Sequence, residues 1–168
     1  MGTVIPRMPP EPLAAHHPNC MGCGPDNPNA LGLRFVVDGD RVRADLRLDE
    51  RHEGAPGFAH GGAVATALDD TIGTLLVILR RPAVTAKLEV DYRKPAFLHR
   101  DFEVEAWCER IEGRKLHLAG ELREGGEVLA EARALFLQVD LEHFAQGGKD
   151  MPERVKEHWR KGEPELPY

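Results

Sequence analysis

The chain has 168 residues, and its 22 lysines and arginines against 28 aspartates and glutamates give a formal net charge of -6. This acidic balance provides no general attraction to nucleic acid or to anionic membrane surfaces. The sequence contains no serine, which excludes every mechanism that uses a serine nucleophile.

Residues 1–30 contain seven prolines, and we expect them to form an irregular arm rather than a helix or strand. The N-terminus has no charged-then-apolar signal pattern, and the longest aliphatic run, residues 75–79, is far shorter than the ~20 residues that span a membrane. Three cysteines do not suggest a secreted disulfide scaffold. We therefore expect a cytoplasmic protein without a membrane partner.

The next elements are a predicted hairpin and a predicted long helix. Residues 31–37 and 42–48 flank an Asp-Gly-Asp turn, and the second segment alternates apolar and charged residues with a period of two. After a polar loop, residues 61–79 carry apolar side chains at helical spacing around most of the circumference. Such a helix is expected to be enclosed by other structure.

The remaining chain predicts strands joined by short turns. Period-two patterns run through residues 87–93, 102–108, 116–122 and 128–139, with glycine-containing turns between the later segments. Short turns imply antiparallel neighbours, so we predict an α+β fold in which a curved antiparallel sheet of about six strands wraps around one long central helix. Residues 31–146 would form this single domain. The polar residues 147–168 are expected to be a loosely attached tail.

An acidic pair, Asp69 and Asp70, lies in the middle of the apolar helix. Successive helical residues point ~100° apart, so the two carboxylates must have different surroundings. Asp70 shares its face with Thr66 and Thr74, whereas the neighbours of Asp69 are small or apolar. Desolvation would raise the pKa of Asp69 and make it a base or nucleophile near neutral pH. The alternative is a structural Asp69 paired with an arginine or a backbone amide.

The helix begins with His60, Gly61 and Gly62. Free N–H groups at a helix start, together with the helix dipole, favour an oxyanion, although two glycines are also typical of a turn with unusual backbone angles. His60 is a candidate general acid or, alternatively, a hydrogen-bonding element of the helix cap. Gly61 and Asp69 are eight residues, ~12 Å, apart along a helix. If both are catalytic, one of them must come from a second subunit.

Three segments within residues 19–139 carry a resemblance to a known family. Residues 57–62 read Gly-Phe-Ala-His-Gly-Gly, with Asp69 nine residues after the histidine. Residues 20–24 read Cys-Met-Gly-Cys-Gly, and residues 90–96 read Val-Asp-Tyr-Arg-Lys-Pro-Ala. Together with the predicted element order, these segments resemble the hotdog-fold acyl-CoA thioesterases of the phenylacetate-pathway (PaaI-like) type.

The resemblance implies a hotdog fold and roles for several residues. Asp69 would be the general base or nucleophile, the Gly61 N–H of the facing subunit would polarise the thioester carbonyl, and Thr85 would orient the attacking water. Gly54 stands where some relatives carry an Asn or Gln that helps the site, so a second oxyanion contact is in doubt. Asp70 receives no catalytic role.

The implied function is an acyl-CoA or aryl-CoA thioesterase that works as a homodimer or a dimer-of-dimers tetramer. No cofactor is expected, because coenzyme A is part of the substrate. Gly62 and the basic residues Arg81, Arg93 and Lys94 are candidate substrate contacts, the basic ones for the coenzyme A phosphates; alternatively they form a solvated rim. The rival function is a non-catalytic hotdog protein that binds acyl-CoA.

The Cys20-x-x-Cys23 pair also permits a zinc site, with His16 or His17 as further ligands. Only one such pair exists, and Cys108 is predicted inside a strand, so we expect no metal. The alternative is a zinc-stabilised interaction domain that uses His17, Cys20 and Cys23. A redox dithiol is not expected, because no thioredoxin-like βαβ unit surrounds the pair.

Overall fold

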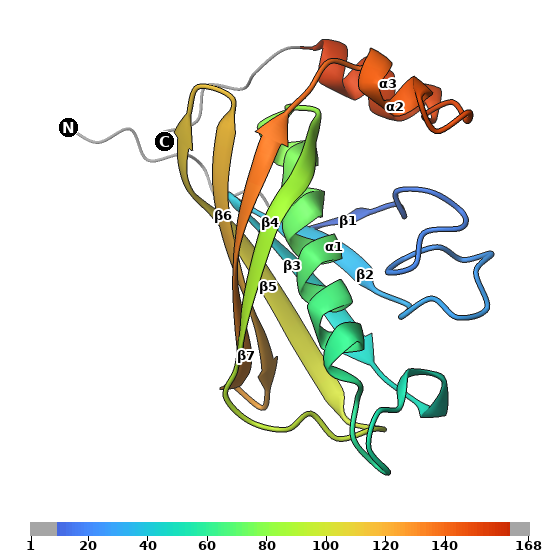
Figure 1. Cartoon of the computed structure of the whole chain (residues 1–168), viewed down its shortest axis with the longest axis vertical. Helices are drawn as coiled ribbons and strands as arrows, with labels where there is room; N and C mark the ends of the chain where they lie inside the picture. The colour runs from blue at the N-terminus through green and yellow to red at the C-terminus, as the bar shows by residue number, and fades with distance from the viewer. Residues whose placement is uncertain (1–9, 162–168) are drawn as a thin grey trace.

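A long helix, α1 (Gly61–Leu79), packs against one face of a seven-stranded antiparallel sheet in the computed structural model, which describes residues 10–161 (Figure 1). The strands run in the order β1-β2-β3-β5-β6-β7-β4, with every neighbouring pair antiparallel. The predicted α+β class, with an antiparallel sheet around one central helix, is confirmed. The strands are β1 (Glu11–Leu13), β2 (Arg34–Asp38), β3 (Arg41–Arg47), β4 (Ala83–Tyr92), β5 (Asp101–Glu112), β6 (Lys115–Glu124) and β7 (Glu127–Gln138).

Helix α1 connects β3 to β4, which have three strands between them in the sheet, so the chain crosses the sheet along this helix. By length and composition α1 would also suffice to cross a membrane, but 56% of its apolar window is buried within the fold, as in a core helix. One side of the helix remains half-exposed at Ala65, Asp69 and Gly73. The fully buried side chains that it contributes to the core include Leu68, Thr71, Ile72, Thr74 and Leu75.

The proline-rich arm contains a strand, which corrects the prediction that residues 1–30 hold none. Strand β1 pairs with β2 from Glu11 opposite Val37 to Leu13 opposite Phe35. A proline is tolerated there because β1 is an edge strand, where one row of backbone groups needs no partner. After β1 the arm crosses to the side of α1 that faces away from the sheet (Figure 1). Residues 1–9 of the predicted arm lie outside the described residues.

The C-terminal segment is not a loose tail throughout. Two helices, α2 (Glu142–Ala145) and α3 (Glu153–Arg160), follow β7 beside the C-terminal end of α1 (Figure 1). The Trp159 ring stacks on Phe144 with centroids 5.5 Å apart, and the His158 ring contacts the carbonyl of Val77 in α1. The prediction failed because a single aromatic anchor among charged residues gives little signal. Residues 162–168 of the predicted tail lie outside the described residues.

Candidate active site

Asp69 and Thr85 meet on the half-exposed side of α1. The Thr85 hydroxyl donates a hydrogen bond of 3.0 Å to Asp69 Oδ1. Thr85 lies at a bulge in β4, where the pairing with β7 shifts between Thr85 and Lys87. A bulge changes which residues of a strand face one side of the sheet, and here it turns the Thr85 side chain toward the helix.

The surroundings of Asp69 favour its protonated form. Burial raises the pKa of this carboxyl, and the charge of Asp70 acts in the same direction, while the hydrogen bond from Thr85 partly opposes both. Among residues 10–161, no arginine, lysine or histidine forms an ion pair with Asp69, and its hydrogen-bond partner is the neutral Thr85. The alternative of an Asp69 anchored by an arginine or a backbone amide therefore finds no support in the described part of the chain.

A cavity of about 480 Å³ opens beside Asp69 and Thr85. Its walls are largely apolar and come from α1, from β4 and β7, from the C-terminal helices, and from residues 13–17 of the arm. No pattern in the sequence predicted a contribution from α2 and α3. The residues that line it include Leu13, Gly73, Leu76, Val77, Phe136, Phe144, Val155 and Trp159.

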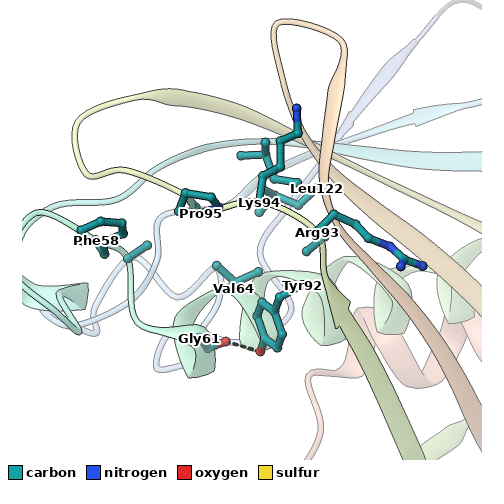
Figure 2. A pocket seen from close by; sticks show the side chains of 12 residues that line it. Phe58, Gly61, Val64, Tyr92, Arg93, Lys94, Pro95 and Leu122 are labelled. Atoms are coloured by element: carbon teal, nitrogen blue, oxygen red, sulfur yellow. Dashed lines mark hydrogen bonds between the residues drawn. The ribbon is translucent and has the colours of Figure 1, made fainter.

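His60 caps the start of α1. Its Nδ1 accepts a hydrogen bond of 2.8 Å from the Gly62 N–H, so that nitrogen carries no proton and the Gly62 N–H is engaged. His60 therefore has the contact expected of a hydrogen-bonding element of the helix cap, which is the alternative to a general acid. Gly61 is the first residue of the helix, where an N–H has no partner within the helix. The Tyr92 hydroxyl donates to the Gly61 carbonyl over 2.7 Å (Figure 2).

Gly61 borders a second cleft, of about 340 Å³, which Asp69 does not line. Figure 2 shows Phe58, Tyr92, Arg93 and Lys94 around it. The two basic side chains are paired with acids of β7: Arg93 with Glu131 at 2.8 Å, and Lys94 with Glu127. The structure thus keeps the Gly61 amide apart from the Asp69 carboxylate of the same chain.

The structure changes the sequence expectation for Arg81 but not the one for Gly54. Arg81 lies at the other end of α1, where its guanidinium donates to the Gly113 carbonyl and to Gln138, so it does not join Arg93 and Lys94. Gly54 packs so closely on the helix start that an added Cβ would lie 3.0 Å from His60 Cα. A larger side chain at position 54 would require the helix start to shift by a few tenths of an ångström, and Gly54 itself has no side chain that could act as a second oxyanion donor.

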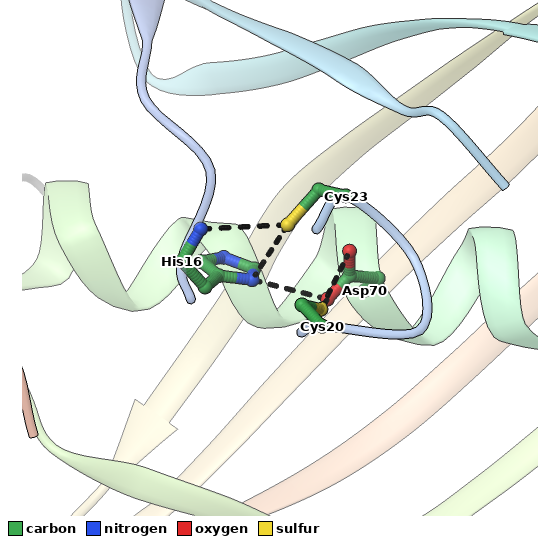
Figure 3. Close-up of side chains that lie close together, drawn as sticks. All are labelled: His16, Cys20, Cys23 and Asp70. Atoms are coloured by element: carbon green, nitrogen blue, oxygen red, sulfur yellow. Dashed lines mark hydrogen bonds and ion pairs between the residues drawn. The ribbon is translucent and has the colours of Figure 1, made fainter. Parts of the chain in front are cut away.

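Asp70 borders the same cavity, but its carboxylate contacts the arm where the arm covers α1. Its Oδ1 lies 3.1 Å from His16 Nδ1 and 3.5 Å from Cys20 Sγ, with Cys23 alongside (Figure 3). Burial lowers the pKa of His16, but hydrogen bonds and charge from Asp70 and Cys20 outweigh it and raise that pKa to about 9. Hydrogen bonding from Cys23, helped by His16, lowers the pKa of the Cys20 thiol to about 3, although burial opposes it. Sequence reasoning considered these cysteines but did not connect them with Asp70.

A family model described as the thioesterase superfamily matches residues 56–133. The chain is 41% identical over 92 residues to acyl-coenzyme A thioesterase THEM4 of Mus musculus, which is 54% of this chain and 40% of that protein. It is 30% identical over 94 residues to the Pseudomonas aeruginosa protein PA0474, which is 54% of this chain and 70% of that protein. The chain thus spans less than half the length of its THEM4 relative.

Solved structures share the fold. A crystal structure of a thioesterase superfamily protein superposes with a TM-score of 0.69 at 28% identity, over 71% of this chain and 60% of that chain. A Streptococcus mutans protein bound to acetyl CoA superposes with a TM-score of 0.58 at 20% identity, over 64% of this chain and 88% of that chain. The sheet around one helix is therefore the hotdog arrangement, as expected.

Proposed function

Because the chain belongs to the thioesterase superfamily, we propose that it hydrolyses acyl-CoA or aryl-CoA thioesters, with Asp69 activating water. The observation that carries the proposal is the desolvated Asp69 carboxyl, which has a raised pKa, a neutral hydrogen-bond partner and an open apolar cavity beside it. A carboxylate of this kind is a stronger base than an exposed aspartate.

The proposed reaction needs one proton acceptor and one oxyanion donor. Asp69 accepts a proton from water while the water oxygen attacks the thioester carbon. The resulting oxyanion collapses, the carbon–sulfur bond breaks, and the departing thiolate takes up the proton from Asp69. Thr85 occupies Asp69 Oδ1, which leaves the second carboxylate oxygen for water. A positioned base commonly contributes about 10²- to 10⁴-fold in rate. Beyond the coenzyme A of the substrate, the proposal includes no catalytic cofactor.

The two cavities fit the two parts of such a substrate. The cavity beside Asp69, about 480 Å³ with mainly apolar walls, is of a size and character that suits an acyl or aryl group. Arg93 and Lys94, on the cleft beside Gly61, are suitable contacts for coenzyme A phosphates. A phosphate that binds there would compete with Glu131 and Glu127 for these cations.

We further propose that two copies of the chain complete each site. Gly61 and Asp69 of one chain line separate cavities, so the Gly61 amide that serves one Asp69 would come from the second copy. Strand β4 supports this arrangement, because it is an edge strand of ten mostly exposed residues with one free row of backbone groups. Such an edge is suited to pair with another chain.

The proposal is tested by thiol release from a panel of acyl-CoA and aryl-CoA thioesters. Asp69→Ala should lower kcat by about 10²- to 10⁴-fold, whereas Asp40→Asn, in the exposed turn after β2, should match the wild type. Equal rates for Asp69→Ala and wild type would overturn the mechanism. Tight acyl-CoA binding without turnover by the wild type would instead favour the non-catalytic binding protein.

The shared site is tested in the same assay with Gly61→Pro. Proline is well tolerated as the first residue of a helix, and the extended backbone of His60 suits a residue before proline, so the substitution removes mainly the N–H. Gly61→Pro and Asp69→Ala should each be inactive alone. Mixed dimers contain one site with an intact Asp69 and an intact Gly61, so mixing the two variants should restore activity. No recovery in mixtures proven to contain both chains would contradict sharing between copies.

A further inference from the structure

Four potential metal ligands converge where the arm crosses α1. Donor atoms of His16, Cys20, Cys23 and Asp70 all lie within 4.8 Å of one another (Figure 3). Three come from a short stretch of the arm and the fourth from the middle of the helix, about fifty residues later in the chain. Imidazole nitrogen, thiolate sulfur and carboxylate oxygen are the donors that Zn²⁺ takes in proteins.

Three of the six separations between these donors are close to the edges of a zinc tetrahedron. Zinc bonds of about 2.3 Å to sulfur and about 2.0–2.2 Å to nitrogen or oxygen imply donor–donor distances of about 3.3–3.8 Å in tetrahedral geometry. His16 Nδ1 lies 3.5 Å from Cys23 Sγ and 3.1 Å from Asp70 Oδ1, and Asp70 Oδ1 lies 3.5 Å from Cys20 Sγ. All six separations are within 4.8 Å, so one ion at the centre would reach all four donors once the longer separations close by up to about 1 Å.

The histidine ring is held in an orientation that suits metal binding. The Thr74 hydroxyl has one hydrogen, which it donates to the Asp70 carbonyl over 2.8 Å. Its contact of 2.8 Å with His16 Nε2 must therefore be one in which the ring N–H donates. With Nε2 held by Thr74, Nδ1 is the nitrogen that faces the two thiols and Asp70, and it becomes a metal ligand when the incoming ion displaces its proton. Metal-binding histidines commonly donate their second N–H in this way.

The backbone of the arm fixes the cysteines in place. The N–H of Gly24 donates to the Cys20 carbonyl over 2.9 Å, and those of Leu31 and Leu33 donate to the carbonyls of Met21 and Gly22. Gly22 lies directly over Asp70, where an added Cβ would overlap the carboxylate. A loop shaped this closely around a carboxylate brings the thiols and the acid together without strain on the helix.

We infer that His16, Cys20, Cys23 and Asp70 bind one Zn²⁺ ion, which ties the arm to α1 beside the candidate catalytic residue. Four protein ligands complete a tetrahedron and leave no position for water, so the ion is structural and takes no part in hydrolysis. This site reverses the expectation of no metal. It also replaces His17 by His16, since His17 Nδ1 instead accepts from the Asn19 N–H within the arm.

The site is tested first on the wild-type chain, so that no variant has to fold. Protein expressed with added Zn²⁺, purified under reducing conditions without a metal-affinity step, should contain about one zinc per chain by mass spectrometry of the elements. A mercurial thiol reagent should release that zinc to a coloured chelator. Exchange for Co²⁺ should give the intense visible absorption of a tetrahedral cobalt thiolate. Zinc far below one per chain, with no cobalt spectrum, would overturn the inference.

Variants then assign the ligands. Zinc should be lost from the double variant Cys20→Ser, Cys23→Ser, and retained by Cys108→Ser, whose thiol is buried in β5 away from the arm. Thr74→Val should weaken zinc affinity by about 10- to 100-fold in competition with a chelating dye, because it removes the partner that orients the His16 ring. Retention of zinc by the double cysteine variant, or its loss from Cys108→Ser, would contradict this ligand set.

Discussion

Two adjacent aspartates on α1 have contrasting surroundings. Asp69 faces an apolar cavity and has one neutral hydrogen-bond partner, Thr85. Asp70 faces the arm, where His16 and Cys20 contact its carboxylate. The rotation of ~100° between successive helical residues produces this difference. One carboxylate is left poised for proton transfer, and the other is held in place as an attachment point.

The two aspartates also have opposite effects on the stability of the folded state. A buried carboxylate without a cation disfavours its charged form, which opposes folding at neutral pH. A carboxylate beside a protonated histidine, or on a metal, is stabilised in its charged form. Asp69 therefore serves the proposed function and Asp70 serves stability. Substitutions at the two positions should change the free energy of unfolding in opposite directions.

The largest effect is expected from Asp70→Asn, paired with Asp69→Asn as the comparison. Asp70→Asn removes a charged partner of His16 and should lower the free energy of unfolding by about 1.5–3 kcal/mol. Asp69→Asn should raise it slightly at pH 7, because the raised pKa of Asp69 means that the fold disfavours the charged carboxylate.

Denaturant unfolding over a range of pH checks both signs. The folded pKa of Asp69 lies above its unfolded value of about 3.9, so the penalty is full above the folded pKa. It fades as pH falls toward the unfolded value, where the carboxyl is protonated in both states. The gain from Asp69→Asn should fade over the same range. If both variants destabilise the protein at neutral pH, the two carboxylates do not have the opposite effects on stability proposed here.

A somewhat smaller effect is expected from Gly22→Ala on the arm side. The added methyl group would overlap the Asp70 carboxylate, so the arm must shift away from α1. Overpacking of this kind typically costs about 1–3 kcal/mol. Thermal and denaturant unfolding measure the loss, with Gly147→Ala as the control, because an added Cβ there meets only a carbonyl at 3.6 Å. Equal stability of the two variants would mean that the arm does not hold this position.

The smallest effect is expected on the cavity side, from Thr85→Val. Loss of the hydrogen bond to Asp69, worth about 0.5–1.5 kcal/mol, should reduce kcat/KM by about 2- to 10-fold. Because this hydrogen bond lowers the pKa of Asp69, its removal should move the acidic limb of the pH–rate profile to higher pH. Thr85→Ser keeps the hydroxyl and should keep the profile. If the acidic limb of the pH–rate profile does not move in Thr85→Val, the hydrogen bond from Thr85 does not influence the pKa of Asp69.

Much of the fold could be predicted because its patterns are local. The apolar run of α1 and the alternation and turns of the later strands are properties of neighbouring residues, and the structure places all of them as expected. The sheet has seven strands rather than about six, since β1 adds to its edge. The small strand and the C-terminal helices were missed because their stability comes from contacts with distant segments rather than from their own sequence.

The candidate site likewise has one feature that follows from local sequence and others that depend on contacts between distant residues. The anomalous position of Asp69 follows from its helical neighbours alone. Its contact with Thr85 depends on the bulge in β4, since the alternation over residues 87–93, extended backwards, would turn Thr85 away from the helix. The basic residues close in sequence were expected together, yet Arg81 and Arg93 lie at opposite ends of β4, because a strand of ten residues separates them.

By itself the sequence determined that serine takes no part, that a long apolar helix carries two acids, and that these acids face different ways. Those conclusions need only composition and the geometry of one helix. The tertiary structure alone decided what each acid meets: a threonine brought by a strand bulge on one side, and a histidine and two cysteines brought by the arm on the other. Such contacts join residues far apart in the chain, and only packing determines which of them meet.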